Sequence, residues 1–394
     1  MSFRKFTALT AVILFTVLFP ISASILNSQN AGFSIDIPEG FELAEKNGST
    51  SYLFEHTILP VDLIIRLYDE SRFKNAEQTA ENVMQSLNAE YDKDSIKWRN
   101  ADCIILTFSF NLGGNIVSGW GITAETKDTK GKKHFPVLLA YAPDEYATDC
   151  EQFLISCIDS FYTDRGSFYE AGPLTSYAFP PEGAEAHSIE IGGKKIDFKL
   201  DKSDIEADRF VVEREYAVLT IYQKSPDWQK AWQRYYRQIF RNECSRLKNA
   251  SFAIENALLY NDENLISLPE EQKNELLLKT LLSWVQQFPY KRNTSASDFE
   301  PVTSVISGAG SDCDSRAMLL AVLMANMNCK TCIFVSQEYS HAVFGLKINM
   351  KGAKIRLEGT DYLLSETTAR VDPGLIAKDM NDTNKWIGVE LILQ

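Results

Sequence analysis

Residues 308–317 (GAGSDCDSRA) run directly into an apolar stretch at residues 318–327 (MLLAVLMANM), and this junction decides how the C-terminal part is built. Ser311 and Asp312 are typical helix-capping residues, and the apolar side chains that follow recur at helical spacing. Cys313 is therefore predicted at the N-terminus of a buried helix. The helix dipole and the unpaired backbone N–H groups favour a thiolate there and can bind an oxyanion. Both are properties of a nucleophilic site.

The residues on either side of this cysteine oppose its ionisation. Asp312 and Asp314 are carboxylates, and a neighbouring negative charge disfavours a thiolate. Activation of Cys313 must therefore depend on a histidine that takes the thiol proton. His341 is the downstream histidine in a suitable position.

The sequence after the helix predicts an antiparallel meander. Residues 331–335 (TCIFV), 340–348 (SHAVFGLKI) and 362–368 (YLLSETT) have strand patterns and are separated by turn residues. His341 begins the second of these strands, and Glu366 lies near the end of the third. Strand ends of such a meander can lie side by side and face the helix start. This order predicts a thiol nucleophile, an imidazole base and a carboxylate that orients the imidazole.

Four pieces of sequence carry a resemblance to a known family. They are "WVQQFPY" (284–290), "GSDCDSRAMLLAVLMANMN" (310–328), "SHAVFGL" (340–346) and "YLLSETT" (362–368). The segment from Leu276 to Thr368 resembles the transglutaminase-like superfamily, which has a papain-related fold. The resemblance implies that Cys313 is the nucleophile, His341 the base and Glu366 the third catalytic residue.

The same resemblance leaves the roles of some residues undecided. Gln286 and Tyr290 match the segment that often lines the family's cleft, and the Gln286 side chain is a candidate oxyanion donor. The acidic block has Glu-Thr-Thr in place of the commoner Asp-Pro-Thr, so Asp361 and Asp372 are rivals for the acid. Glu366 is preferred because its flanking residues match the block in register. Asp372 belongs to an Asp-Pro-Gly turn, and Asp361 lies at the turn before the strand.

The sequence divides into four parts. Residues 1–24 carry Arg4 and Lys5, an apolar run and small residues, the layout of a secretory signal peptide. Residues 25–164 alternate strand and helix patterns and predict an α+β domain with an antiparallel sheet. Its "FSIDIPEGFEL" opening (33–43) has a faint similarity to the PsbP-like fold. Residues 165–187 are rich in Gly, Pro, Ser and Ala and predict a linker. Residues 188–394 are predicted to be a strand-rich lead-in and the transglutaminase-like domain.

Periodicity predicts individual elements in both domains. The predicted strands are 33–37, 61–68, 103–110, 114–122, 134–141, 189–191, 196–200 and 209–222. The predicted helices are 76–87, 146–161, 228–247 and 269–288. The aromatic stripe of the helix at 228–247 is interpreted as core packing.

Composition limits the partners. The formal net charge is −13 and the pI is about 5.0. Charge repulsion therefore argues against nucleic acid or an anionic membrane as a binding partner. The chain has seven cysteines, an odd number for an exported protein, and no disulfide is assigned. Cys329 and Cys332 have CxxC spacing without a second ligand pair, so they are interpreted as core residues. No metal or organic cofactor is expected.

These observations predict an exported, periplasmic or extracellular, thiol-dependent enzyme. It would be a peptidase or amidase that acts on protein or cell-envelope peptide amides through a thioester. Two alternatives remain: a binding or scaffold module that keeps the fold without turnover, and a protein-crosslinking transglutaminase. The first alternative is favoured by the acids beside Cys313 and by the unexplained N-terminal domain.

Overall fold

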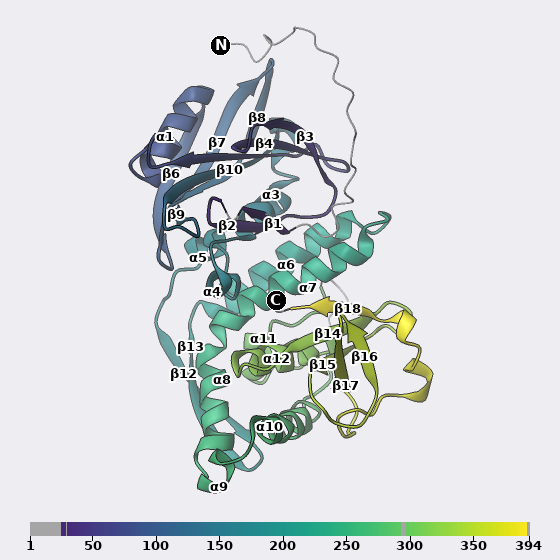
Figure 1. Cartoon of the computed structure of the whole chain (residues 1–394). Coiled ribbons are helices and arrows are strands. Elements are labelled where there is room, and N and C mark those ends of the chain that lie inside the picture. Colours follow the sequence, from purple (N-terminus) through teal and green to yellow (C-terminus); the bar gives the residue numbers. More distant parts are fainter. Residues whose placement is uncertain (1–24, 29, 293–296, 392–394) are drawn as a thin grey trace.

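The structure, a computed structural model, describes residues 25–28, 30–292 and 297–391. Two lobes lie one above the other, with helices α6 (Asp204–Ile221) and α7 (Trp228–Arg246) running between them (Figure 1). The upper lobe contains the elements up to Ala178, and the lower lobe contains those from Ala184 onward. The predicted signal peptide, residues 1–24, lies outside the described residues.

The upper lobe is built on antiparallel sheets. Its large sheet has eight strands in the order β3-β4-β5-β10-β8-β7-β6, with β9 paired to β10, and a small sheet has the order β1-β2-β11. The strands are β1 (Ile25–Ser28), β2 (Phe33–Asp36), β3 (Phe41–Asn47), β4 (Ser51–His56), β5 (Asp62–Asp69), β6 (Glu90–Trp98), β7 (Ala101–Leu112), β8 (Asn115–Ala124), β9 (Thr126–Lys127), β10 (Lys133–Pro143) and β11 (Phe161–Tyr162).

Both faces of the large sheet are covered because its central strands carry apolar residues at consecutive positions. Ile105 and Leu106, neighbours on β7, belong to two different core clusters, as the alternation of side chains along a strand requires. Helix α1 (Ala76–Leu87) packs on one face, and α3 (Glu151–Asp159) packs on the other. The Asn75 side chain caps α1 by accepting a hydrogen bond from the Gln78 amide at 2.8 Å.

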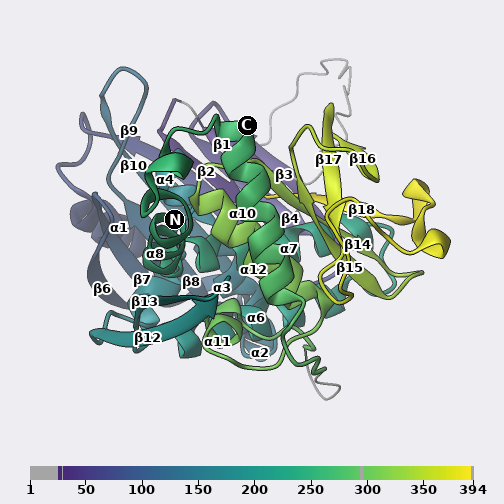
Figure 2. The same cartoon turned by 90° about the horizontal axis from the view of Figure 1, so that it is seen from below.

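The lower lobe begins with a hairpin and continues with a run of helices. Its elements before the second large sheet are β12 (Ala184–Ile191), β13 (Lys194–Asp201), α6 (Asp204–Ile221), α7 (Trp228–Arg246), α8 (Lys248–Glu255), a π-helical turn (Asn256–Tyr260), α9 (Glu263–Ile266), α10 (Glu270–Val285), α11 (Val302–Ile306) and α12 (Cys313–Asn326). Seen from below, α10 and α12 lie between α8 and the C-terminal sheet (Figure 2).

The C-terminal sheet is antiparallel and packs against α12. Its strands are β14 (Thr331–Ser336), β15 (His341–Leu346), β16 (Lys354–Leu357), β17 (Thr360–Ser365) and β18 (Ile387–Glu390), in the order β16-β17-β15-β14-β18. It is not the simple meander that the sequence predicts, because β17 rather than β16 pairs with β15. Phe344 of β15 pairs with Ser365 of β17, which brings the start of β15 beside the end of β17. The α+β fold class and the Cys-bearing helix packed on an antiparallel sheet are therefore confirmed.

Three other sequence expectations differ from the structure. The predicted linker at 165–187 contains α4 (Arg165–Phe168) and α5 (Pro173–Ala178), and the Leu174 amide donates a hydrogen bond to the buried Asp159 carboxylate at 2.8 Å. The predicted strand at 209–222 was wrong, because α6 occupies it. The single helix predicted at 146–161 is instead α2 (Asp144–Ala147) followed by α3.

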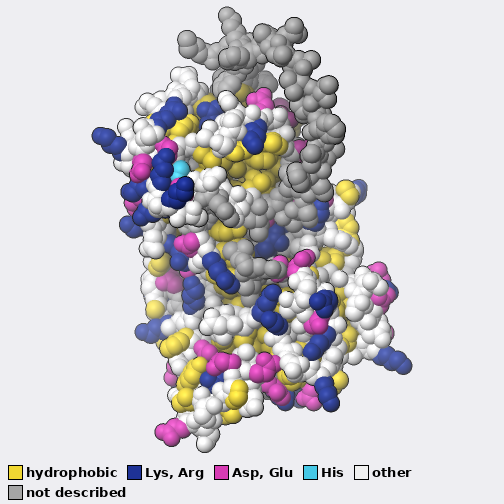
Figure 3. Space-filling model, in the orientation of Figure 1, with side chains coloured by type: hydrophobic (Ala, Val, Ile, Leu, Met, Phe, Trp, Pro, Cys, Tyr) yellow, Lys and Arg dark blue, Asp and Glu magenta, His cyan; other side chains and the backbone are white. Residues whose placement is uncertain are grey.

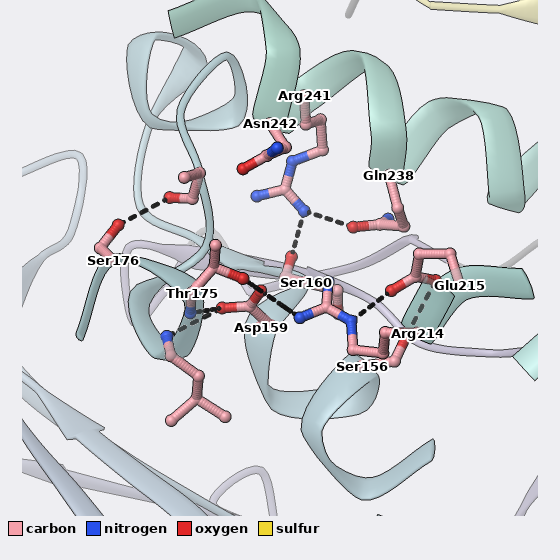
Figure 4. Close-up of polar contacts among 12 residues, drawn as sticks. Ser156, Asp159, Ser160, Thr175, Ser176, Arg214, Glu215, Gln238, Arg241 and Asn242 are labelled. Atoms are coloured by element: carbon pink, nitrogen blue, oxygen red, sulfur yellow. Dashed lines mark hydrogen bonds and ion pairs between the residues drawn. The ribbon is translucent and has the colours of Figure 1, made fainter. Parts of the chain in front are cut away.

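A buried ionic network joins α6 and α7 to the upper lobe (Figure 4). Arg214 of α6 donates to the Asp159 carboxylate at 2.7 Å and to Glu215 at 2.8 Å, and all three side chains are at most 3% exposed. Arg234 of α7 donates to Glu215 at 2.9 Å and to the Ser156 hydroxyl at 3.0 Å. Each buried charge therefore has an opposite charge beside it, as removal from water requires.

Asp36 at the end of β2 is the second centre of this network. Its carboxylate accepts hydrogen bonds from Arg237 at 2.6 and 2.9 Å and from Gln238 at 2.8 Å. Arg234 donates to the Asp36 backbone carbonyl at 2.8 Å. Burial by itself would raise the pKa of Asp36, but Arg237 and Arg234 hold that pKa below its ordinary value.

Removal of Arg237 from its pair with Asp36 is predicted to destabilise the fold strongly. Arg237→Leu should lower the free energy of unfolding by about 3–5 kcal/mol, because Asp36 stays buried without its main counter-charge. Urea denaturation followed by circular dichroism measures the loss. Arg209→Leu is the control, since Arg209 is 51% exposed and lies 3.5 Å from Glu300, and an exposed pair contributes under about 1 kcal/mol.

The stability that Asp36 contributes is predicted to fall as the pH is lowered. Because the pKa of Asp36 is lower in the folded state, the unfolded state binds more protons as the medium is acidified. The stability that Asp36 contributes is complete above its unfolded pKa of about 3.9 and is lost as the pH falls through its folded pKa. Arg237→Leu should move that loss to higher pH. Equal stability losses in Arg237→Leu and Arg209→Leu would contradict this role.

Candidate functional site

Cys313 lies at the first position of α12, as its sequence predicts. The Asp312 side chain caps this helix by accepting hydrogen bonds from the Ser315 amide at 2.9 Å and the Ser315 hydroxyl at 2.7 Å. The helix behind Cys313 is almost wholly buried, and Cys313 itself is 7% exposed. The thiol therefore lies just below the protein surface, on a helix that is packed into the core.

The structure brings His341 and Glu366 together. His341 begins β15, Glu366 follows β17, and the His341 Nε2 atom lies 2.7 Å from the Glu366 Oε2 atom. The other carboxylate oxygen of Glu366 accepts hydrogen bonds from the Thr368 amide at 2.7 Å and the Thr368 hydroxyl at 2.6 Å. Burial would raise the pKa of Glu366, but the bonds from His341 and Thr368 hold it below its ordinary value.

Neither rival acid occupies this position. The Asp361 side chain is 56% exposed and lies 3.4 Å from that of Arg356. Asp361 is near the start of β17, whereas His341 lies beside the end of that strand. Asp372 is exposed in the turn after β17. Glu366 is therefore the carboxylate that fixes the His341 ring, with Nε2 engaged and Nδ1 on the opposite edge of the ring.

Cys313 and His341 line one cleft of about 700 Å³. The cleft lies between the α6–α7 hairpin on one side and α12 with the β14–β15 hairpin on the other. One wall is aromatic, and its members are Tyr216, Tyr222, Trp228, Trp232, Tyr235 and Tyr236. The volume is within the range of about 300–1,000 Å³ that is typical of ligand sites.

This aromatic wall is the part of the site that the sequence interpretation missed. The stripe on α7 was interpreted as core packing, and Tyr235 and Tyr236 do belong to the core. The same two residues also face the cleft together with Trp232, because α7 lies at the edge of the core. An aromatic stripe shows helical periodicity whichever neighbour covers it, so the pattern alone gives no signal of a cleft.

The Cys313 thiol is held in its neutral form. Burial raises its pKa well above the ordinary thiol value, and the adjacent Asp314 raises it further, accepting a hydrogen bond from the Cys313 sulfur at 3.1 Å. The Ala342 backbone amide donates to the same sulfur and acts in the opposite direction. This contact connects the strand that begins at His341 with the nucleophile position.

Asp314 belongs to a short chain of hydrogen bonds. Its second carboxylate oxygen accepts a hydrogen bond from the Tyr236 hydroxyl, which is part of the aromatic wall. Burial raises the pKa of Asp314, and burial together with Asp314 raises the pKa of Asp312 to about 7. The two carboxylic acids that the sequence places beside Cys313 are thus weaker acids than usual.

The two residues that the sequence resemblance places at the cleft, Gln286 and Tyr290, have different surroundings. The Gln286 side-chain amide donates to the Glu366 carbonyl at 2.8 Å and to the Val371 carbonyl at 2.9 Å. Both of its N–H donors are therefore used to hold the Glu366 segment, which contradicts an oxyanion role. Tyr290 is 58% exposed, pairs with Ser311 in an isolated β-bridge and lies close enough to Cys313 for the charge of that residue to add to the effect of burial in raising the pKa of Tyr290.

Arg316 is a positioning residue that the sequence analysis did not single out. It donates to the Thr367 carbonyl at 3.3 Å and to the Phe288 carbonyl at 2.9 Å, and it is 1% exposed. Together with Gln286 it ties the backbone of Glu366 and of the residues that follow it to α12 and to the end of α10. A charged residue within an apolar helix is the signal that could have identified it.

Within residues 25–28, 30–292 and 297–391 no group of three or more His, Cys, Asp or Glu side chains is arranged to hold a metal ion. All seven cysteines are buried and free. Cys329 and Cys332 are both core residues and form no disulfide with each other. No helix in this described part of the chain is long and apolar enough to cross a membrane.

Comparisons with known proteins do not identify a family for this chain. No protein-family model matches the sequence, and no curated protein is significantly similar to it. One solved structure with similarity is LpqN of Mycobacterium tuberculosis, described as involved in cell envelope biogenesis. The TM-score is 0.23 and the identity 12%, over 32% of this chain and 78% of that chain. A similarity this weak carries no argument about function, so the site is interpreted from its own residues.

The Cys313–Asp314 contact makes a prediction about reactivity. Asp314→Asn removes a negative charge next to the sulfur while it keeps a hydrogen-bond acceptor, so the pKa of Cys313 should fall by at least one unit. The rate of alkylation by iodoacetamide at pH 7 should then rise about tenfold, because the thiolate is the reacting form. Mass spectrometry of the Cys313 peptide measures the rate.

Asp361→Asn is the matched control, since it removes an exposed carboxylate from the same lobe without touching Cys313. Its alkylation rate should equal that of the unsubstituted protein. An Asp314→Asn protein that reacts no faster than this control would show that burial alone sets the state of the thiol.

Proposed function

We propose that the protein is a thiol-dependent acyl-transfer enzyme of the transglutaminase-like kind, which works as a peptidase or amidase. The observation that carries the proposal is the 2.7 Å hydrogen bond between Glu366 and His341, which lines the same cleft as Cys313. A nucleophile, a base and a residue that orients the base are the groups that acyl transfer needs. Four further cavities among the described residues do not combine a cysteine with a histidine.

The proposed reaction begins when the Cys313 sulfur attacks the amide carbonyl carbon of the substrate. The thiol proton passes to Nδ1 of His341, and Glu366 stabilises the resulting imidazolium through Nε2. Collapse of the tetrahedral intermediate breaks the C–N bond, and His341 returns the proton to the leaving amine. Water then attacks the thioester, giving its proton to His341, and the acid product leaves as the Cys313 thiol forms again.

The helix start supplies the expected oxyanion site. Backbone N–H groups in the first turn of a helix have no partner within that helix, and the dipole adds a partial positive charge. The Cys313 backbone N–H lies in this turn. The Gln286 side chain, with both donors engaged, is not part of the proposal.

The proposed substrate is a protein or a cell-envelope peptide. A cleft with an aromatic wall suits a peptide chain, because aromatic rings provide large contact areas at low entropic cost. The basic and apolar pattern of residues 1–24 supports export to the periplasm or the cell exterior. Hydrolysis is favoured over crosslinking, because the residues around Cys313 include no feature that marks an amine acceptor.

A second candidate function is a binding module that keeps the fold without turnover. The observation in its favour is the hydrogen bond from the Cys313 sulfur to Asp314, which stabilises the unreactive thiol. In an active enzyme the Cys313 thiol must break its hydrogen bond to Asp314 and give its proton to His341 when substrate enters. In a binding module this transfer never occurs, and the aromatic wall alone would hold the ligand.

The two candidates differ in their cleavage products. The purified protein is incubated with a denatured proteome, and new peptide N-termini are labelled and identified by mass spectrometry. We expect sites that appear with the unsubstituted protein and disappear with Cys313→Ala. His341→Ala should lower kcat/KM on a peptide made from such a site about 10³-fold, and Glu366→Gln about a hundredfold or more.

Cys150→Ala is the control, because Cys150 is buried in the upper lobe and takes no part in the cleft. It should keep full activity. If added cadaverine is incorporated at the same sites, the acyl group passes to an amine and the enzyme is a transferase. If no site depends on Cys313 and iodoacetamide modifies Cys313 at the same rate in His341→Ala as in the unsubstituted protein, the binding module is the better account.

A further inference from the structure

A second cavity of about 730 Å³ lies between the two lobes, and it shares no lining residue with the Cys313 cleft. It is formed where four separate segments meet: the β6–β7 turn, the start of α4, the start of α8 and the α12–β14 turn. We call it the basic pocket and define it by Arg99, Arg165, Tyr169, Lys248, Asn328 and Lys330, which all line it.

The charge of the basic pocket is opposite to that of the chain. Its lining includes the cations Arg99, Arg165, Lys248 and Lys330 and no carboxylate, whereas the whole chain has a net charge of −13. Figure 3 shows Lys and Arg side chains across the middle of one face, at the height of α4 and the upper end of α8. Gathering four like charges costs energy unless an anion or nearby acids offset it.

Two nearby acids, Glu170 and Asp164, offset part of this charge, and the Asp164 Oδ1 atom lies beside Gly166, close to the Arg99 guanidinium. Glu170 lies 2.7 Å from Arg99 and 2.6 Å from Lys248, so it orients both side chains at the rim. Lys330 donates to the Thr360 hydroxyl at 3.3 Å, and the structure's described residues include no carboxylate within ion-pair distance of Arg165. The C-terminal end of α12 adds only about half a negative charge. The pocket therefore keeps an excess of positive charge.

The backbone around the pocket is shaped for the arginine side chain. A Cβ atom at Gly166 would lie 2.8 Å from the Arg99 Nη2 atom, so the absence of a side chain there leaves room for the guanidinium. Arg99 itself has a positive φ of 53°, and it projects from a tight turn rather than from a strand. A non-glycine residue in this conformation carries a backbone cost, which fits a side chain that has a specific position to fill.

We propose that the basic pocket binds the phosphate group of a phosphorylated small molecule or headgroup. Arginine guanidinium and lysine ammonium groups are the side-chain groups that recognise phosphate oxygens, and four residues of these two types line the pocket from four different segments. The volume exceeds that of a bare phosphate, so an attached organic group fits beside Tyr169 and Asn328. The ligand bridges both lobes, because Arg99 and Arg165 belong to the upper lobe and Lys248 and Lys330 to the lower lobe.

The position of the pocket gives such a ligand a route to the candidate active site. Helix α12 begins at Cys313 in the cleft and ends at Asn326, which lines the basic pocket. A ligand that holds the two lobes together would also fix the helix at its far end. The binding itself does not depend on the proposed enzyme activity and can be tested without a substrate.

The test is isothermal titration calorimetry of the full chain with inorganic pyrophosphate and with glucose 6-phosphate, and with glucose as the uncharged control. We expect saturable binding of both phosphates at concentrations up to about 1 mM, none of glucose, and weaker binding as salt is added. Arg165→Gln should weaken binding about tenfold, and Arg165→Gln combined with Lys248→Gln should abolish it. Arg356→Gln, an exposed arginine on β16, is the control and should bind normally.

Vesicles of phosphatidylglycerol and of phosphatidylcholine separate the two sources of phosphate. Flotation with phosphatidylglycerol that Arg165→Gln abolishes would support the proposal with a lipid headgroup as ligand. Binding of the soluble phosphates without flotation would support it with a free phosphate ester. Failure of pyrophosphate and glucose 6-phosphate to bind, or binding that Arg165→Gln and the double variant leave unchanged, would overturn the proposal.

Discussion

The arginines of α6 and α7 hold the two lobes together, and the candidate site depends on them. Arg214, Arg234 and Arg237 are buried beside Asp159, Glu215 and Asp36, three acids that would be unstable there without a counter-charge. This network fixes the α6–α7 hairpin against the upper lobe. The opposite side of the same hairpin supplies the aromatic wall of the cleft. The upper lobe, whose role the sequence does not explain, therefore helps to position the wall over Cys313.

The environment of Cys313 is a balance between two opposing effects. The start of α12 and the Ala342 amide favour the thiolate, whereas burial, Asp314 and Asp312 favour the thiol. Burial and Asp314 dominate in this state. Tyr236 connects this balance to the aromatic wall, because its hydroxyl donates to Asp314. A ligand that displaces Tyr236 or changes the solvation of Asp314 would thus alter the reactivity of the thiol.

Local sequence patterns predicted the elements around the site well. The helix at Cys313, the strands at His341 and before Glu366, and α1 and α7 all lie where periodicity and capping placed them. The clearest failure is α6, whose β-branched and aromatic residues between 209 and 222 suggested a strand. Burial of Arg214 and Glu215 against the upper lobe outweighs that preference. The roles of Gln286 and Arg316 could not be predicted either, because their hydrogen-bond partners lie far along the chain.

The sequence by itself determined that a cysteine begins a buried helix and that a histidine and a glutamate follow on antiparallel strands. These are consequences of local spacing, capping and turn residues, which act over a few positions. Only the tertiary structure decided which acid meets His341, which way the thiol proton points, and that α7 serves both core and cleft. It also brought four cations from distant segments into one pocket. Such features depend on contacts between residues far apart in the chain, where local pattern carries no information.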